Sequence, residues 1–78
     1  MHANISIYTI NENSIRIVGV QNGAAKVRVY SMLGKQLHTT SFQGNGMNDV
    51  DLPKVAKGVY LIQLETEIGI LNKKIIIE

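Results

Sequence analysis

Apolar and polar residues alternate with a period of two along nearly the whole chain, and this pattern constrains the fold more than any other feature. The alternation is plain in SIRIV (residues 14–18) and in KVRVY (residues 26–30). Successive side chains of a β-strand point to opposite faces, so the alternation indicates strands that bury one face. Gly or Asn interrupts the pattern about every ten residues, which is typical of a β-sandwich or a β-barrel. The sequence therefore predicts an all-β fold.

About seven strands are expected, and the most strand-like pair ends the chain. Their bounds are residues 4–10, 14–20, 25–31, 35–42, 48–52, 58–66 and 70–77. The strand at 58–66 starts with apolar residues on both faces, which suits a central position. The strand at 70–77 contains Lys73 and Lys74, and such charges keep a sheet edge from pairing with other chains. The one candidate for a helical turn is 53–57, which begins with Pro53 and is closed by Gly58.

The composition indicates a small globular domain. With 45% hydrophobic and 18% charged residues, residues 1–78 are expected to form a single domain. The absence of cysteine excludes disulfides and thiolate metal sites. The net charge of +2 is scattered along the chain, which argues against nucleic acid as a partner. No apolar run approaches the roughly 20 residues that cross a bilayer, so direct membrane insertion is not expected.

The sequence contains candidate catalytic residues but no motif for the groups that would activate them. A serine–histidine–acid set would be drawn from Ser31, His38 and Asp49 or Asp51. Such a triad also needs an orienting partner and an oxyanion hole, and no motif marks either. The sequence therefore predicts no enzyme and no catalytic residue.

Metal, cofactor and sugar sites are equally poorly supported. His2 and His38 are too few for a histidine metal site. Residues 45–51 carry oxygen ligands at alternating positions, which calcium could use, but they lack the terminal bidentate glutamate of a calcium loop. Three Tyr, one Phe and no Trp make an aromatic platform for sugars improbable. We expect no metal and no cofactor.

Two turns carry apolar residues where polar ones are usual. In the first, Ser31 is expected to bond the backbone two residues on, and Gly34 to supply the positive φ that closes the hairpin. Met32 and Leu33 lie at its tip, and Ile68 lies at the tip of the turn before Gly69. Such residues either fold back over the end of a sandwich or form a hydrophobic contact point for a partner. The first behaviour is the commoner one.

The second half of the chain resembles a known family. AKVRVYSMLGKQL (residues 25–37) and DVDLPKVAKGVYLIQLETEIGILNKKIIIE (residues 49–78) resemble the type A C-terminal sorting domain of type IX secretion cargo from Bacteroidota. The residues that match its motifs are Tyr30, Gly34 and Lys35 in the first piece, Leu52, Gly58 and Tyr60 in the second, and Lys73 and Lys74 in the last strand. Ser31 stands where the family usually has Asp, and YTINENSIRI (residues 8–17) replaces its usual Tyr-Pro-Asn-Pro segment.

This resemblance implies an Ig-like antiparallel β-sandwich that serves as a secretion signal. The implied partners are the outer-membrane translocon of type IX secretion, a surface sortase that removes the domain, and an N-terminal passenger protein. The implied location is the cell surface or the secreted space, reached through the periplasm, and residues 1–78 would be excised from a longer secreted protein. Lys73 and Lys74 would then act as edge protection, as translocon contacts, or as both.

A rival hypothesis is an adhesive or carbohydrate-binding β-sandwich that accompanies a surface enzyme. Fold alone does not separate the two, because β-sandwiches carry many functions.

Overall fold

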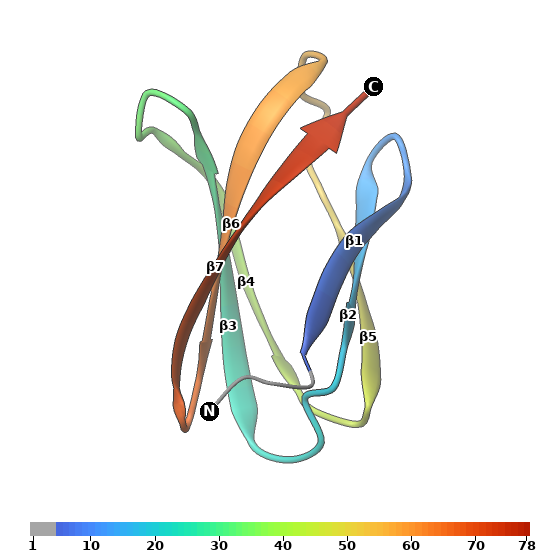
Figure 1. Ribbon diagram of the computed structural model, residues 1–78, viewed down its shortest axis with the longest axis vertical. Helices are drawn as coiled ribbons and strands as arrows, with labels where there is room; N and C mark the ends of the chain where they lie inside the picture. Colours follow the sequence, from blue (N-terminus) through green and yellow to red (C-terminus); the bar gives the residue numbers. More distant parts are fainter. Residues whose placement is uncertain (1–4) are drawn as a thin grey trace.

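A computed structural model describes residues 5–78, which form two antiparallel sheets packed face to face (Figure 1). The strands are β1 (Ser6–Asn11), β2 (Ser14–Val18), β3 (Ala24–Ser31), β4 (Gln36–Gln43), β5 (Met47–Asp51), β6 (Gly58–Thr66) and β7 (Gly69–Ile77). The predicted all-β sandwich is confirmed, and each strand end lies within about two residues of its predicted position. Asn4, where the first strand was expected to begin, lies outside the described residues.

The order of the strands is that of an immunoglobulin-like sandwich. One sheet has the order β1-β2-β5 and the other has the order β4-β3-β6-β7, and the chain changes sheet after β2, β4 and β5. Immunoglobulin constant domains place the strands A, B, E and D against C, F and G. Here the fourth strand pairs with β3 instead, so the second sheet has four strands and the first has three.

The core lies between the sheets and consists of the inward positions of the alternating strands. Ile15 and Ile17 of β2 are fully buried, as are Val27 of β3 and Ile62 and Leu64 of β6. Burying an aliphatic side chain of this size contributes about 1.5–3 kcal/mol. The alternation that predicted the strands therefore also supplies the shared core of the two sheets.

β6 and β7 occupy the positions that their sequences predicted. β6 is hydrogen-bonded to β3 on one side and to β7 on the other, so it is a central strand. β7 pairs with β6 alone and forms an edge of its sheet. Its free side lies near β1 of the other sheet (Figure 1). The edge position of the lysine-bearing strand is thus confirmed.

The predicted helical turn at 53–57 is wrong. The linker between β5 and β6 is irregular and carries the chain from one sheet to the other. Its ends are held by packing, because Leu52 is buried and donates its N–H to the carbonyl of Asn13 at 2.7 Å, while Val55 packs against the core. A helix advances about 1.5 Å per residue against about 3.3 Å for extended chain. A helical turn would therefore shorten a segment that has to cross between layers.

Candidate recognition surface

Several of the motif residues maintain the fold. Leu52 and Tyr60 belong to the core, with 6% and 9% of their surfaces exposed. The Tyr60 hydroxyl donates a hydrogen bond to the carbonyl of Ala56, which ties the linker to the start of β6. Gly58 has a φ of +154°, a value that residues with a Cβ rarely adopt. These motif positions are explained by the local structure.

The turn between β3 and β4 is closed by three hydrogen bonds. The N–H of Ser31 donates to the carbonyl of Lys35, and the N–H of Gly34 donates to the carbonyl of Ser31, both at 2.9 Å. The Ser31 hydroxyl accepts from the N–H of Lys35 at 3.2 Å, so its predicted bond two residues on is wrong. Gly34 has the predicted positive φ, at +91°. The turn is ordered by its backbone and needs no packing of its tip.

The apolar turn tips do not fold back over the sandwich. Met32, Leu33 and Ile68 are 54%, 98% and 62% exposed, so the commoner expectation is wrong for them. For the first turn the reason is strand length. β3 and β4 contain 8 residues each, whereas β2 and β5 contain 5 each, and the turn projects away from the three-stranded sheet (Figure 1). Leu33, at the tip of this turn, therefore stays exposed to solvent.

The outer face of the four-stranded sheet continues the apolar surface of this turn. In register across three strands, Tyr30 of β3 lies beside Leu61 of β6, and Leu61 lies beside Lys74 of β7. Val59 and Ile76 form the neighbouring pair and are 41% and 62% exposed. An open depression of about 350 Å³ lies on this face. The residues that line it are Tyr30, Ser31, Met32, Gly34, Leu61, Gln63 and Lys74.

We name this region the turn-end patch. It consists of Tyr30, Met32, Leu33, Val59, Leu61, Lys74 and Ile76. It brings together motif residues from the first and last pieces of the sequence, which are more than forty residues apart in the chain. The sequence identified Tyr30 and Lys74 through the motif, whereas Val59, Leu61 and Ile76 were missed because their outward direction depends on the register of β6 and β7.

The two lysines of β7 point to opposite faces of the sheet. Lys74 is in register with Leu61 and lies on the outer face, within the turn-end patch. Lys73 is in register with the buried Ile62, so it belongs to the inward face at the open edge of the sheet. An inward-pointing charge at an edge is a common protection against strand addition. The two lysines therefore have different surroundings despite being adjacent.

The candidate catalytic residues are not brought together. Asp49 and Asp51 belong to β5, in the sheet that does not contain Ser31 and His38. Asp49 accepts hydrogen bonds from Arg16 at 2.9 and 3.2 Å, and Asp51 accepts one from the Ser14 hydroxyl at 3.0 Å. The hydrogen bonds and charge of Arg16 hold the pKa of Asp49 below its usual range. Both carboxylates are thus engaged by neighbours on β2.

The same hydrogen bonds argue against the hypothesis that residues 45–51 bind calcium, because they occupy the acidic side chains. The segment forms β5 from Met47 onwards, and its acidic side chains are occupied as described. Among residues 5–78, no group of His, Cys, Asp and Glu side chains is placed to hold a metal ion. His2 lies outside the described residues. Within residues 5–78 there is also no helix long and apolar enough to cross a membrane.

Comparison with known proteins decides the family. A family model described as the secretion system C-terminal sorting domain matches residues 2–78. The chain belongs to this family. The match includes residues 8–17, where the usual Tyr-Pro-Asn-Pro segment is replaced, so the resemblance seen in the second half extends over nearly the whole chain. A search of curated proteins gave no match.

Membership establishes what the sorting domain does. It is a C-terminal sorting signal of type IX secretion, a system of Bacteroidota, and it directs export across the outer membrane to the cell surface or the secreted space. The family is associated with the type IX machinery and with a passenger protein on the N-terminal side. Sorting domains are in general not catalytic.

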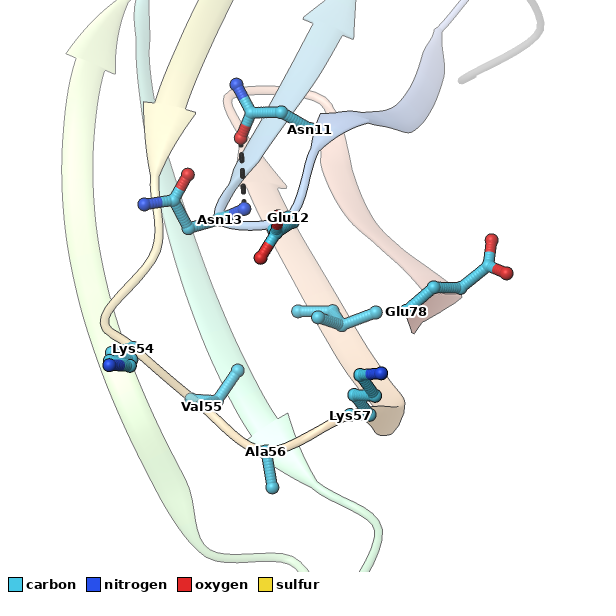
Figure 2. A pocket seen from close by; sticks show the side chains of 9 residues that line it. Asn11, Glu12, Asn13, Lys54, Val55, Ala56, Lys57 and Glu78 are labelled. Atoms are coloured by element: carbon cyan, nitrogen blue, oxygen red, sulfur yellow. Dashed lines mark hydrogen bonds between the residues drawn. The ribbon is translucent and has the colours of Figure 1, made fainter.

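The sorting domain also has a pocket outside the turn-end patch. This pocket of about 580 Å³ lies between the β1–β2 turn, the linker before β6 and the end of β7 (Figure 2). Glu12 and Glu78 contribute acidic groups to it, and Lys54 and Lys57 contribute basic ones. The sequence does not indicate this pocket, because three segments that are distant in the chain form it.

Proposed function

We propose that the outer-membrane translocon of type IX secretion recognises the folded sandwich of residues 1–78 as one domain, and that a surface sortase then separates it from an N-terminal passenger. The observation that carries the proposal is the meeting of Tyr30, Gly34 and Lys74 around one surface depression. These motif residues come from separate elements, so a partner can contact them together only when the sandwich is folded.

The motif residues divide into two roles in this proposal. Leu52, Tyr60 and the glycines Gly34 and Gly58 build the fold that presents the signal. Tyr30, Lys35 and Lys74 lie at the surface and are available to the translocon, and Lys73 protects the sheet edge. Substituting the first group would reduce export through unfolding, whereas substituting Tyr30, Lys35 or Lys74 would reduce export of a folded domain.

We infer that the domain itself has no catalytic activity. The support is that Asp49 and Asp51, the acids of the candidate triad, are hydrogen-bonded to β2. Their sheet is not the one that contains Ser31 and His38. The adhesive alternative has little support from the aromatic residues. Tyr60 is buried in the core, while Tyr8 and Tyr30 lie on different sheets, so these rings do not form one sugar-binding platform.

The test is export of a foreign passenger. Residues 1–78 are fused behind a periplasm-targeted fluorescent protein in a bacterium with type IX machinery. Fluorescence is measured in the periplasm, on the cell surface and in the medium. The expected result is fluorescence at the surface or in the medium, and periplasmic retention in a matched strain without the translocon. Retention of the intact fusion in the first strain would refute the proposal.

A truncation separates the fold from the signal. The same fusion ending at Gly69 removes most of β7 and leaves one side of β6 without hydrogen-bonding partners. We expect this fusion to remain in the periplasm and to be degraded faster than the intact one. Export of the truncated fusion at the normal rate would show that the last strand is dispensable.

A further inference from the structure

The turn-end patch exposes more apolar side-chain surface at one site than a domain without a binding partner needs. Leu33 is 98% exposed at the turn tip, and Met32 and Ile76 are 54% and 62% exposed. Isolated apolar residues are common on protein surfaces, but a contiguous apolar area at one site marks a place of interaction. Here Met32 lines one depression with Tyr30 and Leu61, and Leu33 follows Met32 in the turn. Ile76 is paired with Val59 on the same outer face. The turn is also held by its own backbone, so its tip contributes little to folding.

The charges beside the depression are basic. Lys74 lines the depression, and Lys35 is exposed at the end of the turn. Neither forms a salt bridge with any of residues 5–78. Glu65, on the same outer face, lies toward the other end of the sheet and is paired with Arg28 at 2.9 Å. Glu78, at the end of the chain, lines the pockets on the β1 side and not the depression. The turn-end patch therefore presents apolar area with unneutralised positive charge.

We propose that the turn-end patch docks against an apolar protein surface of the export machinery that carries carboxylates opposite Lys74 and Lys35. This inference rests on the proposed function and adds the face and the chemistry of the partner. Leu33 and Met32 enter an apolar recess of that surface, and the carboxylates pair with the lysine ammonium groups. Complementary charge around an apolar centre fixes orientation and partner choice.

The distribution of charge favours such a partner over a second copy of the chain. A two-fold symmetric contact brings the same surface of each copy together. Patch against patch would place Lys74 and Lys35 of one copy close to those of the other, and like charges brought together at an interface are costly. An acidic partner meets the same apolar area without this repulsion.

The same distribution disfavours a lipid surface. Sequences that bind anionic membranes through charge generally present about four to eight clustered basic residues. The turn-end patch has Lys74, with Lys35 close by in the turn, and these lysines are too few to meet that requirement. The depression beside Lys74 is also concave, which suits a protruding side chain of a protein better than a bilayer plane.

The chain supplies a closely matched control for this proposal. Met32 and Met47 are 54% and 53% exposed, on the four-stranded and the three-stranded sheet side respectively. Lys74 and Lys73 are adjacent but face opposite ways. The test variant is Met32→Ser with Lys74→Glu, and the control is Met47→Ser with Lys73→Glu. Both variants make the same chemical changes and the same change of net charge.

Export of the fluorescent fusion is measured for both variants beside the unsubstituted fusion. The test variant is expected to lose about tenfold or more in export rate, because truncating a central contact and reversing a paired charge are each costly. The control is expected to remain within about twofold of the unsubstituted fusion. Melting temperatures of the isolated domains show whether each variant is folded. If the test variant melts early, Leu33→Ser alone replaces it, with Ile68→Ser as its control.

The outcomes are distinct. If the unsubstituted fusion is not exported, the proposed function fails. If it is exported and the test variant keeps the same rate, the turn-end patch is not the contact and this inference is wrong. Binding to outer-membrane vesicles with and without the translocon is measured in parallel at low and high salt. The expected binding requires the translocon and weakens with salt. Equal binding to protein-free anionic liposomes, or a dimer in light scattering that the test variant abolishes, would overturn the inference.

Discussion

Each outer face of the sandwich has a cross-strand row with a tyrosine and a charged residue, but the two rows have different surroundings. On the three-stranded sheet, Tyr8, Arg16 and Asp49 lie in register across β1, β2 and β5. Arg16 and Asp49 form an ion pair at 2.9 Å. On the four-stranded sheet, the row from β3 through β6 to β7 has a tyrosine at one end and a lysine at the other, with Leu61 between them.

The difference teaches which of the two rows pairs its charge within the domain. A charge paired across neighbouring strands is satisfied within the sheet. The lysine of the other row adjoins apolar side chains and has no acidic partner among residues 5–78, so it is available to a carboxylate of another protein. The first row is paired within its sheet, and the second leaves an unpaired charge for the proposed contact.

The largest expected effect is on stability and concerns the core between the two sheets. Replacing Ile62 by Ala removes a side chain with 0% exposure and leaves a cavity between the sheets. We expect a loss of about 2–4 kcal/mol in the free energy of unfolding. Chemical denaturation of the isolated domain measures it. A loss well under about 1 kcal/mol would show that the sheets do not share one tight core, and the comparison of two faces would break down.

A smaller effect is expected at the turn that carries Met32 and Leu33. Gly34 has a φ of +91°, and a Cβ added to it would meet no atom within 4 Å, so Gly34→Ala would suffer from backbone strain and not from a clash. The expected cost is about 1 kcal/mol, with a smaller cost for Gly34→Asn, which tolerates positive φ better. Denaturation curves of the two variants test this order. Equal stability of Gly34→Ala and the unsubstituted domain would show that the turn relaxes to another shape.

The two motif tyrosines allow the core to be compared with the outer face of the four-stranded sheet. Tyr60→Phe removes the hydrogen bond to the carbonyl of Ala56 and is expected to cost about 1 kcal/mol. Tyr30→Phe, on the outer face, is expected to leave stability almost unchanged. The check is the midpoint of denaturation for both variants. A larger loss for the Tyr30 variant would reverse the assignment of the two residues to surface and fold.

The smallest effect is a pH dependence on the three-stranded face. The pKa of Asp49 is lowered by its hydrogen bonds to Arg16 and by the charge of that residue. The ion pair therefore stabilises the fold above the ordinary carboxyl pKa, and this contribution is lost as the pH falls through the lowered value. Because both side chains are exposed to solvent, the contribution is small.

We expect the melting temperature of the unsubstituted domain to fall slightly more between about pH 5 and pH 2 than that of Asp49→Asn. Calorimetry over this range measures the difference. Parallel pH curves for the two proteins would mean that the ion pair does not contribute to stability. In that case the two outer faces would differ less than the distances suggest.

The sequence predicted most of the fold because alternation and glycine breaks are local signals. β6 was predicted at its observed bounds, since Gly58 and the alternation of Tyr60, Ile62 and Leu64 leave little choice of register. The helical turn at 53–57 was predicted wrongly, because the distance between the sheets decides the conformation of that linker and is absent from local sequence.

The candidate site was predictable only in part. Tyr30 and Lys74 were found through the family resemblance, and nothing in their local sequence shows that they meet. Which face Lys73 and Lys74 take follows from the pairing of β7 with β6, and that register places Leu61 beside Lys74. Leu33 was expected to be covered, and its exposure results from the projection of the β3–β4 turn beyond the shorter opposing sheet.

The most direct test of the central claim is site-specific photo-crosslinking during export. A photoreactive amino acid is placed at Leu33, on the turn-end patch, or at Met47, on the opposite face, in the exported fusion. Living cells are irradiated, and adducts are identified by mass spectrometry. We predict adducts with an outer-membrane protein of the type IX machinery from position 33 and none from position 47. Equal adducts from both positions, or adducts from position 47 alone, while export proceeds normally, would contradict the account.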